Sequence, residues 1–435
     1  MLPRYTLPPF ENLWNERSKW QRVLDVELAV SDSLAEAGVI PLDAAYQMRQ
    51  RANFDVDKIA EYEKITRHDV IAFLQSVGDH IGEYKRYLHL GLTSYDVIDT
   101  ALSIALVEAG DYIMDALRKL TASLSLQAVK HKDTLMPGRT HGMHAEPITL
   151  GWKISSWLAE ANRNIDRWRY AVDGVKFGKL SGAVGTYPNI TPDLEKVICA
   201  KLGLTPETIS TQVIPRDRHA EYTFVIASIG AMCERIALEV RLLQHSEVGE
   251  LYEPFMKGQR GSSAMPHKKN PVTSENICGL SRMLRSFVSP ALENIALWHE
   301  RDISHSSVER IILPDATSLV YYILNRTNWM IENWVVREDV MMDHLEQSKG
   351  LMFSGALLTA LKIAGIEDDD IYRRVQEHAL SAQSGGLTFP ERVKEDPVIT
   401  QAIGDKLDAL FNSQEILKRA HIPLERVSLN IFPKE

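Results

Sequence analysis

The segment SYDVIDTALSIALVEAGDYIMDALRKLTASLSLQAVKHK, from Ser94 to Lys132, carries apolar residues at helical spacing along its whole length. The positions that show this spacing are Val97, Ala101 and Ile104 and then Ile113, Leu117, Leu120 and Leu124. An average helix has ~11 residues, whereas one of about 30 residues is about 45 Å long, which exceeds the diameter of a small domain. A stripe of that length must pack against other long helices, so it predicts a helical bundle.

Four further segments show the same spacing. They begin near residues 147, 217, 271 and 314 and extend to about residues 175, 252, 295 and 334. Five long helices predict an all-α protein built on a central bundle. Because the helices of one chain cover only part of each stripe, copies of the same chain are the simplest cover for the rest, which predicts a homo-oligomer; a large monomeric bundle is the alternative.

The chain has 435 residues, which is too long for one compact core. We expect an N-terminal helical domain over residues 1–93, the central bundle over 94–346 and a C-terminal helical domain over 347–435. The first domain should contain a helix over 12–38 that ends at Gly38 and another around 71–81. The last domain has shorter helical patterns, an acidic stretch at 367–370 and a break at Gly385-Gly386.

Composition excludes several classes of protein. A net charge of −9 argues against a nucleic-acid binder, because backbone recognition of DNA or RNA needs a basic face. The three cysteines, Cys199, Cys233 and Cys278, have no CxxC spacing, which argues against a disulfide framework or a zinc ribbon. The N-terminus lacks a signal-peptide pattern and no apolar run reaches membrane-spanning length, so we expect a soluble, cytoplasmic protein.

The polar segment GQRGSSAMPHKKNP, residues 258–271, interrupts the helical patterns. Its glycines and serines expose backbone N–H groups, and His267, Lys268 and Lys269 add positive charge, which predicts a receptacle for an anion or a developing negative charge. Asn270 and Pro271 fit the N-cap and first residue of the next helix. A mobile basic surface loop is the alternative.

Further polar clusters lie at residues 66–69 and 89–94, and polar loops are expected at 131–147 and 298–310. His141 can donate a proton near its reference pKa of ~6.5, and Arg301, Ser306 and Arg310 are donors that suit phosphate or carboxylate. HExxH, CxxC, Walker and GxSxG motifs are all missing from the sequence. What remains is acid–base chemistry on an anionic substrate, as in an elimination.

The segment GSSAMPHKKNP at 261–271 resembles the signature of the fumarase/aspartase superfamily. Within it, TRHDV at 66–70, HLGLTSYDVIDT at 89–100 and RDISHSSVER at 301–310 make nearly the whole chain similar to the adenylosuccinate lyases. The resemblance implies a three-domain, all-α homotetramer whose central helices form one shared bundle. It also implies active sites built from three subunits, with no cofactor and no metal.

The implied reaction is β-elimination of fumarate from adenylosuccinate, giving AMP, and from SAICAR, giving AICAR, in purine biosynthesis. Two alternatives remain: a carboxymuconate cycloisomerase of the same superfamily, and a catalytically silent structural relative. The cycloisomerase handles no phosphate, so the Arg67-His68-Asp69 cluster, Arg4-Tyr5 and the segment 306–310 favour the nucleotide substrate. Retention of Ser262 and His141 disfavours a silent copy.

The resemblance also implies roles for individual residues. Ser262 is the expected base, with Ser263 as the alternative, and His141 is the acid that protonates the departing nitrogen. Lys268 and Asn270 would stabilise the aci-carboxylate intermediate, while Glu275 and His68 would support His141. The residues expected to contact the succinyl group are Thr93, Ser94, Gln212 and Ser263. Those expected to contact the nucleotide and its phosphate, or to assist there, are Arg4, Tyr5, Arg67, His68, Asp69, His89, Arg301, Ser306, Ser307 and Arg310.

A base carried on a long loop can approach the substrate and exclude water when the loop closes. Gly258 and Gly261 are the expected hinges. We therefore predict high mobility of residues 258–270 in the absence of ligand.

Overall fold

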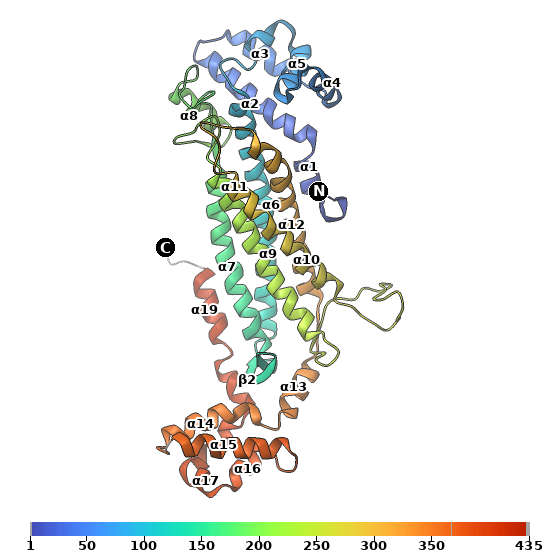
Figure 1. The fold of residues 1–435 in the computed structure, drawn as a ribbon, viewed down its shortest axis with the longest axis vertical. Helices are drawn as coiled ribbons and strands as arrows, with labels where there is room; N and C mark the ends of the chain where they lie inside the picture. The colour runs from blue at the N-terminus through green and yellow to red at the C-terminus, as the bar shows by residue number, and fades with distance from the viewer. Residues whose placement is uncertain (1, 367, 432–435) are drawn as a thin grey trace. The chain divides into compact units, whose positions relative to one another are not determined.

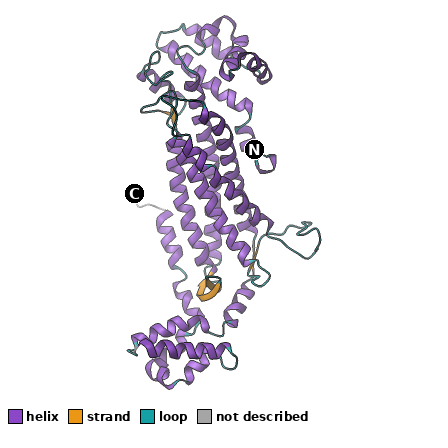
Figure 2. Ribbon diagram, viewed as in Figure 1, coloured by secondary structure: helices purple, strands orange, loops and turns teal. Residues whose placement is uncertain are grey.

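The computed structural model describes residues 2–366 and 368–431, and these are predominantly helical (Figures 1 and 2). The chain divides into two compact units. Unit 1 comprises Met1–Arg118, Arg163–Cys233 and Ile277–Asn325, and unit 2 comprises Lys119–Asn162, Glu234–Asn276 and Arg326–Glu435. The prediction of an all-α fold is confirmed. No helix in the described part of the chain is long and apolar enough to cross a membrane.

Five long helices contribute to both units (Figure 1). They are α6 (Ser94–Lys130), α7 (Leu150–Val175), α9 (Asp217–Leu243), α10 (Val272–Ser286) and α12 (Ser304–Asn333). Much of each predicted apolar stripe is buried within its unit. The side chains with no exposed surface include Leu106, Ile113, Trp168, Ile226 and Leu284 in unit 1, and Leu124, Ile154, Ile236 and Ile331 in unit 2. Burial of each such side chain stabilises the fold by roughly 1.5–3 kcal/mol.

Three predicted helix boundaries are wrong. The helix expected to reach residue 252 ends at Leu243, because Gly249 (φ +61°) turns the chain and the Glu250 N–H donates back to the Leu243 carbonyl at 3.0 Å. The helix expected to reach residue 295 ends at Ser286 and resumes as α11 (Val288–Glu293). Pro290 causes this break, because it cannot donate to the carbonyl four residues earlier.

The helix expected to begin at Pro314 begins at Ser304, so Pro314 lies inside α12. The hydroxyls of Thr317 and Ser318 donate to the Leu313 and Pro314 carbonyls at 2.7 and 2.6 Å. Pro314 itself lacks the N–H that would donate to the carbonyl of Arg310, four residues earlier, and the helix continues past it. The expected polar loop at 298–310 is therefore helical from Ser304 onward.

The segment expected to be a polar loop at 131–147 contains a β-hairpin (Figure 2). Strands β1 (Leu135–Thr140) and β2 (Met143–Thr149) are antiparallel, with Thr140 opposite Met143. Its two-residue turn is His141-Gly142, with φ of +55° and +78°. Positive φ at both central residues is what a type I′ hairpin turn requires, so the His-Gly pair was the sequence signal for a hairpin.

The N-terminal part of unit 1 consists of α1 (Pro8–Leu13), α2 (Glu16–Glu36), α3 (Leu42–Arg51), α4 (Val56–Thr66) and α5 (Asp69–Ile81). The single helix predicted over 12–38 is divided at Asn15, whose side chain caps α2 by accepting from the Ser18 N–H at 2.7 Å. Gly38 follows the end of α2 with φ +74°, as predicted. The predicted helix around 71–81 is α5, and its Phe73 ring stacks on Trp20 at 4.9 Å.

Unit 1 also contains α8 (Pro192–Lys201) and the short parallel pair β3 (Phe177–Gly178) and β4 (Thr205–Pro206). In unit 2, β5 (Leu251–Tyr252) pairs antiparallel with β6 (Val335–Val336). Both pairs are only two residues long and leave the fold class unchanged.

The C-terminal part of unit 2 consists of short helices, as predicted. They are α13 (Glu338–Gln347), α14 (Ser354–Ile363), α15 (Asp368–Gln383), α16 (Phe389–Glu395), α17 (Pro397–Ile403), α18 (Leu407–Leu410) and α19 (Ile422–Ile431). Helices α14 to α17 enclose a core that includes Leu357, Phe389 and Ile399. Gly385 and Gly386, both with positive φ, separate α15 from α16 as expected. Glu367, part of the acidic stretch, lies outside the described residues.

Candidate active site

The predicted site residues form two groups, one in each unit. The unit 2 group comprises His141, Ser262, Ser263, Lys268, Asn270 and Glu275. The unit 1 group comprises Arg4, Tyr5, Arg67, His68, Asp69, His89, Thr93, Ser94, Gln212, Arg301, Ser306, Ser307 and Arg310. Each group is described within its own unit.

The loop that carries the signature is closed at its base by short-range contacts in unit 2. The Asn270 side chain donates to the Gly261 carbonyl at 2.8 Å, and the Lys268 N–H donates to the Met265 carbonyl at 3.1 Å. A Cβ atom on Gly261 would lie 2.0 Å from the Lys268 carbonyl oxygen, so this position requires glycine. Gly258 has φ +86°, which suits a hinge, whereas close packing explains Gly261.

Ser262 differs from Ser263 in its surroundings. The Ser262 Oγ accepts from the N–H groups of Ala264 and Met265 at 3.2 and 3.1 Å. Two backbone donors on one hydroxyl oxygen stabilise negative charge there. Ser262 is half-buried and Ser263 is exposed.

The predicted N-cap role of Asn270 is wrong, because its side chain bonds back to Gly261 and α10 begins at Val272. The buried carboxylate of Glu253 occupies that role instead: it accepts from the N–H groups of Thr273 and Ser274 at 3.0 and 2.9 Å. Sequence reasoning missed Glu253, because it lies about 20 residues before the helix it caps.

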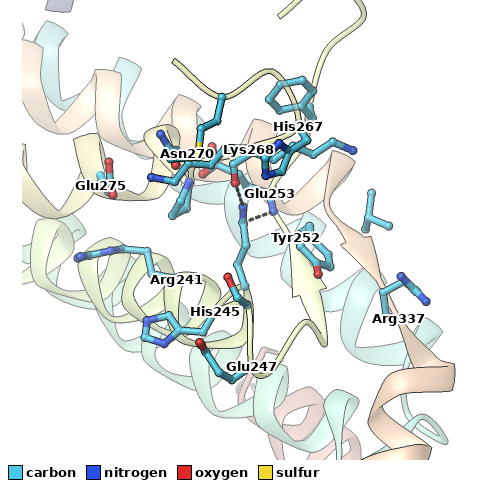
Figure 3. A pocket seen from close by; sticks show the side chains of 17 residues that line it. Arg241, His245, Glu247, Tyr252, Glu253, His267, Lys268, Asn270, Glu275 and Arg337 are labelled. Atoms are coloured by element: carbon cyan, nitrogen blue, oxygen red, sulfur yellow. Dashed lines mark hydrogen bonds between the residues drawn. The ribbon is translucent and has the colours of Figure 1, made fainter. Parts of the chain in front are cut away.

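A cavity of about 1020 Å³ lies beside this loop within unit 2. Figure 3 shows the loop residues His267, Lys268 and Asn270 along one edge of the cavity and Arg241 and His245 along the opposite edge. Glu275, in the first turn of α10, also lines it. Cationic groups outnumber the carboxylates here, so the cavity suits an anion.

Gln244, at the end of α9, connects the two ends of the loop. Its Nε2 donates to the Lys269 carbonyl at 3.0 Å, and its Oε1 accepts from the Glu253 N–H at 2.9 Å; dashed lines in Figure 3 mark both hydrogen bonds. Gln244 is only 8% exposed. A buried amide that satisfies two backbone groups fixes the path of the chain on either side of the loop.

His141 is exposed at the tip of the hairpin, and a buried ion pair holds the strands beneath it. Glu250 has no exposed surface and forms a bidentate pair with Arg139 at 2.5 and 2.8 Å. His344 of α13 contacts the same carboxylate at 2.6 Å. Neither Glu250 nor His344 was predicted, since both are far from the hairpin in sequence.

In unit 1, Asp69 and Arg310 form an ion pair at 2.6 Å. Burial alone would raise the pKa of Asp69, but the hydrogen bond and charge of Arg310 hold that pKa below its ordinary value. His68 is the N-cap of α5, and its Nδ1 accepts from the Ile71 N–H at 3.4 Å. Asp69 thus joins the 66–69 cluster to the start of α12 and orients the guanidinium of Arg310.

Arg301 and Gln212 are also brought together. The Arg301 Nη1 donates to the Gln212 Oε1 at 2.7 Å, and its guanidinium lies 3.6 Å from the centre of the Tyr95 ring. The Gln212 Nε2 donates to the Ala183 carbonyl at 3.0 Å. The buried Nε of Arg301 has no hydrogen-bond partner among the described residues, so one donor remains for a ligand.

The other residues of the unit 1 group occupy helix ends. Ser94 begins α6, and the Thr93 N–H donates to the Asp96 carboxylate at 2.8 Å. Arg67 ends α4 in the left-handed conformation, at φ +53°. The remaining members are Tyr5, edge-on to Tyr322 at 5.4 Å, the exposed Arg4, the buried Ser306, the exposed Ser307 and His89, whose Nδ1 lies 2.6 Å from Glu27.

A buried charge network supports the start of α12. Arg216 pairs with Asp99 at 2.6 Å and with Glu309 at 3.1 Å, and Glu309 also contacts His219 and His305 at 2.8 and 3.1 Å. Burial alone would raise the pKa of Glu309, but Arg216 and His219 hold it well below its ordinary value. Glu309 lies next to Arg310 in sequence, so the network fixes the backbone that carries the predicted anion-binding residue.

Two family models match the chain. The model described as "Lyase" matches residues 4–285, and the model "Adenylosuccinate lyase C-terminus" matches residues 350–427. No group of three or more histidines, cysteines and carboxylates that could hold a metal ion occurs within residues 2–366 and 368–431.

Curated relatives are similar over nearly their full length. An adenylosuccinate lyase of Thermotoga maritima is 46% identical over 98% of this chain and 99% of its own, and one of Synechocystis is 47% identical over 96% and 97%. One of Bacillus subtilis is 44% identical over 99% and 100%.

Among solved structures, the 3-carboxy-cis,cis-muconate lactonizing enzyme of Pseudomonas putida has a TM-score of 0.87 at 26% identity, covering 98% of this chain and 97% of its own. A fumarate lyase of Mesorhizobium has a TM-score of 0.88 at 24% identity, covering 97% and 98%.

Proposed function

The chain belongs to the adenylosuccinate lyase family, and from that premise we propose that it eliminates fumarate from adenylosuccinate to give AMP, and from SAICAR to give AICAR. It is thus a carbon–nitrogen lyase of purine biosynthesis. The observation that carries this function is identity of 44–47% to adenylosuccinate lyases over nearly the whole of both chains. The cycloisomerase alternative is not favoured, because the lactonizing enzyme is only 26% identical.

Ser262 serves as the base that removes the proton next to a succinyl carboxylate. A serine is a weak base unless its alkoxide is stabilised. The two backbone N–H groups that donate to its Oγ support this role, and the neighbouring lysines add positive charge. Ser263, whose hydroxyl lies exposed, is the less favoured base.

His141 serves as the acid that protonates the departing nitrogen, and His68 and Glu275 assist it. Its position at the tip of a rigid hairpin allows the imidazole to project toward a substrate. Lys268 and Asn270 stabilise the aci-carboxylate intermediate, which carries the charge that develops during the reaction. The cationic cavity beside the loop supports this assignment.

Arg301, Arg310 and Ser306 hold the nucleotide and its phosphate, and Arg4, Tyr5, Arg67 and His89 complete that part of the site. Gln212, Thr93 and Ser94 hold the succinyl group. The Nε donor of Arg301 without a protein partner supports a ligand-binding role for that residue. We expect no cofactor.

The enzyme acts as a homotetramer whose active sites draw on three subunits, and we place it in the cytoplasm. Exposed apolar side chains on the long helices support such an assembly, among them Leu126 and Val129 of α6 and Leu238 and Leu242 of α9. Faces of this kind are covered when copies of a chain associate. We retain the division into domains at about residues 93 and 346.

The test is incubation of the purified protein with adenylosuccinate, with AMP and fumarate separated by chromatography. Equal amounts of both products are expected. The His141→Gln variant is the control, because it should retain the fold and lose the chemical step. Absence of both products with the unaltered enzyme would reject the function.

A further inference from the structure

Glu27 is a buried carboxylate in the middle of α2. Its side chain has no exposed surface, and no lysine or arginine of the described residues pairs with it. Its two oxygens instead contact one residue: Oε1 lies 2.6 Å from the His89 Nδ1, and Oε2 accepts from the His89 N–H at 3.0 Å. A buried carboxylate with a single partner of variable charge favours the charged form of that partner.

His89 is held in an unusual backbone conformation. Its φ is +59°, in the left-handed region that L-residues seldom adopt. The adjoining turn is fixed as well, since Gly91 has φ +77° and its carbonyl accepts from the Asn189 side chain at 3.2 Å. The contacts of Glu27 with the backbone N–H and the Nδ1 of His89 thus fix the orientation of the ring and favour its charged form.

We infer that Glu27 is a positioning residue that holds the His89 ring in its cationic form and directs it to bind an anionic oxygen of the substrate. The Nδ1–H is used by Glu27, and the Nε2 has no partner among the described residues, so the Nε2–H is the donor for the ligand. Such charge-assisted hydrogen bonds are stronger than neutral ones. This inference rests on the proposed function, in which His89 belongs to the substrate site.

The surrounding charges agree with this assignment. Burial alone would lower the pKa of His89, but the hydrogen bond and charge of Glu27, together with the charge of Asp96, raise it above its ordinary value. Glu27 comes from α2 and Asp96 from the first turn of α6, where Asp96 is itself paired with the buried Lys179. Both carboxylates therefore favour the cationic form of His89, which suits an anionic oxygen of a phosphate or a dicarboxylate.

The sign of the pH effect follows. The stabilising effect of the His89 cation is fully present below the ordinary histidine pKa of ~6.5, and it is lost as the pH rises through the raised pKa of His89. Without the charge of Glu27, the loss should begin near pH 6.5 or below. The charge of His89 in the unaltered enzyme and in the Glu27→Gln variant should therefore differ most at pH values between the pKa of His89 in the variant and its raised pKa in the unaltered enzyme.

The first measurement follows the ring carbons of His89 by NMR in the full-length enzyme labelled with ¹³C-histidine, with His89→Gln to assign the signal. In the unaltered enzyme His89 should titrate above pH 6.5, and in Glu27→Gln it should titrate at or below that value. Glu36→Gln is the matched control, because Glu36 lies on the same helix but is 60% exposed and pairs with Lys201. An unaltered enzyme with neutral His89 at pH 7 would overturn the inference.

The second measurement is equilibrium binding of AMP and of fumarate at pH 6 and pH 8. At pH 8 the Glu27→Gln variant should bind one of the two about tenfold more weakly, with a smaller difference at pH 6. Weaker binding of AMP would show that His89 binds an oxygen of the phosphate, and weaker binding of fumarate would show that it binds an oxygen of the dicarboxylate. Unchanged affinity for both would contradict the inference.

If Glu27→Gln does not fold, His89→Gln replaces it in the binding experiment and should change the ratio of the affinities at pH 6 and pH 8. A ratio equal to that of the unaltered enzyme, for both AMP and fumarate, would reject the assignment. The titration of His89 needs no substrate, so failure of the proposed reaction would be seen separately, as lack of turnover with His89 still protonated.

Discussion

The signature loop of unit 2 and the start of α12 in unit 1 hold their charged residues in opposite ways. Lys268 and Lys269 are exposed on a loop that is fixed mainly at its base. Glu309 and Arg216 are buried in a network in which each charge has at least two partners. In the proposed mechanism, the exposed lysines belong to a loop that moves to reach the substrate, and the buried network supports residues that are in place before the substrate binds.

Replacement of Ser262 by alanine gives the largest expected effect on the loop side. Turnover should fall by about 10²–10⁴-fold, because the base is lost, while substrate should still bind through unit 1. Single-turnover kinetics together with binding of adenylosuccinate separate the two effects. Ser263→Ala is the control and should retain most of the activity. If Ser263→Ala is inactive and Ser262→Ala is active, Ser263 is the base.

Arg216→Met tests the other side of the comparison. It leaves Asp99 and Glu309 without their buried cation, so the free energy of unfolding should fall by about 3–5 kcal/mol. Urea denaturation measures this loss. Arg169→Met is the matched control, since that arginine is exposed and pairs with an exposed carboxylate, and should change stability little. Equal stability of both variants would mean that the network is not a preorganised support.

Gln244→Glu gives the smallest expected effect and tests how the loop is joined to the helices. The new carboxylate keeps the acceptor for the Glu253 N–H and loses the donor to the Lys269 carbonyl, at a cost of about 1–3 kcal/mol. Turnover should fall while affinity for AMP is preserved, and hydrogen exchange should rise in residues 258–270. Gln50→Glu, at an exposed position on α3, serves as the control. Unchanged exchange in the loop would argue against Gln244 as its support.

Much of the fold was predictable because the spacing of apolar residues in a long helix can be recognised from that segment alone. The stripe through Ile113 and Leu117 needs only its own spacing to be recognised, and both side chains are fully buried. The boundaries were less predictable. Pro314 indicates a helix start by local rules, but it lies inside α12, which begins ten residues earlier at Ser304.

The segments of the proposed site that are continuous in sequence could be identified from the sequence, whereas the contacts that support them from distant residues could not. The loop at 258–271 and the Arg301–Arg310 segment can be recognised by their residues alone. Glu250 and Glu27 cannot, because an isolated glutamate in a helical or turn segment has many possible partners. Only folding shows that one pairs with Arg139 and the other with His89.

The turn that carries His141 limits which amino acids can occupy that position. Its φ of +55° suits glycine, and among other residues asparagine, aspartate and histidine accept it most readily. Of these four, only histidine can both gain and lose a proton near neutral pH without a large shift in its pKa. Backbone geometry thus limits position 141 to a few residue types, and the acid role proposed for it selects histidine among them, so few substitutions there would preserve both the turn and the activity.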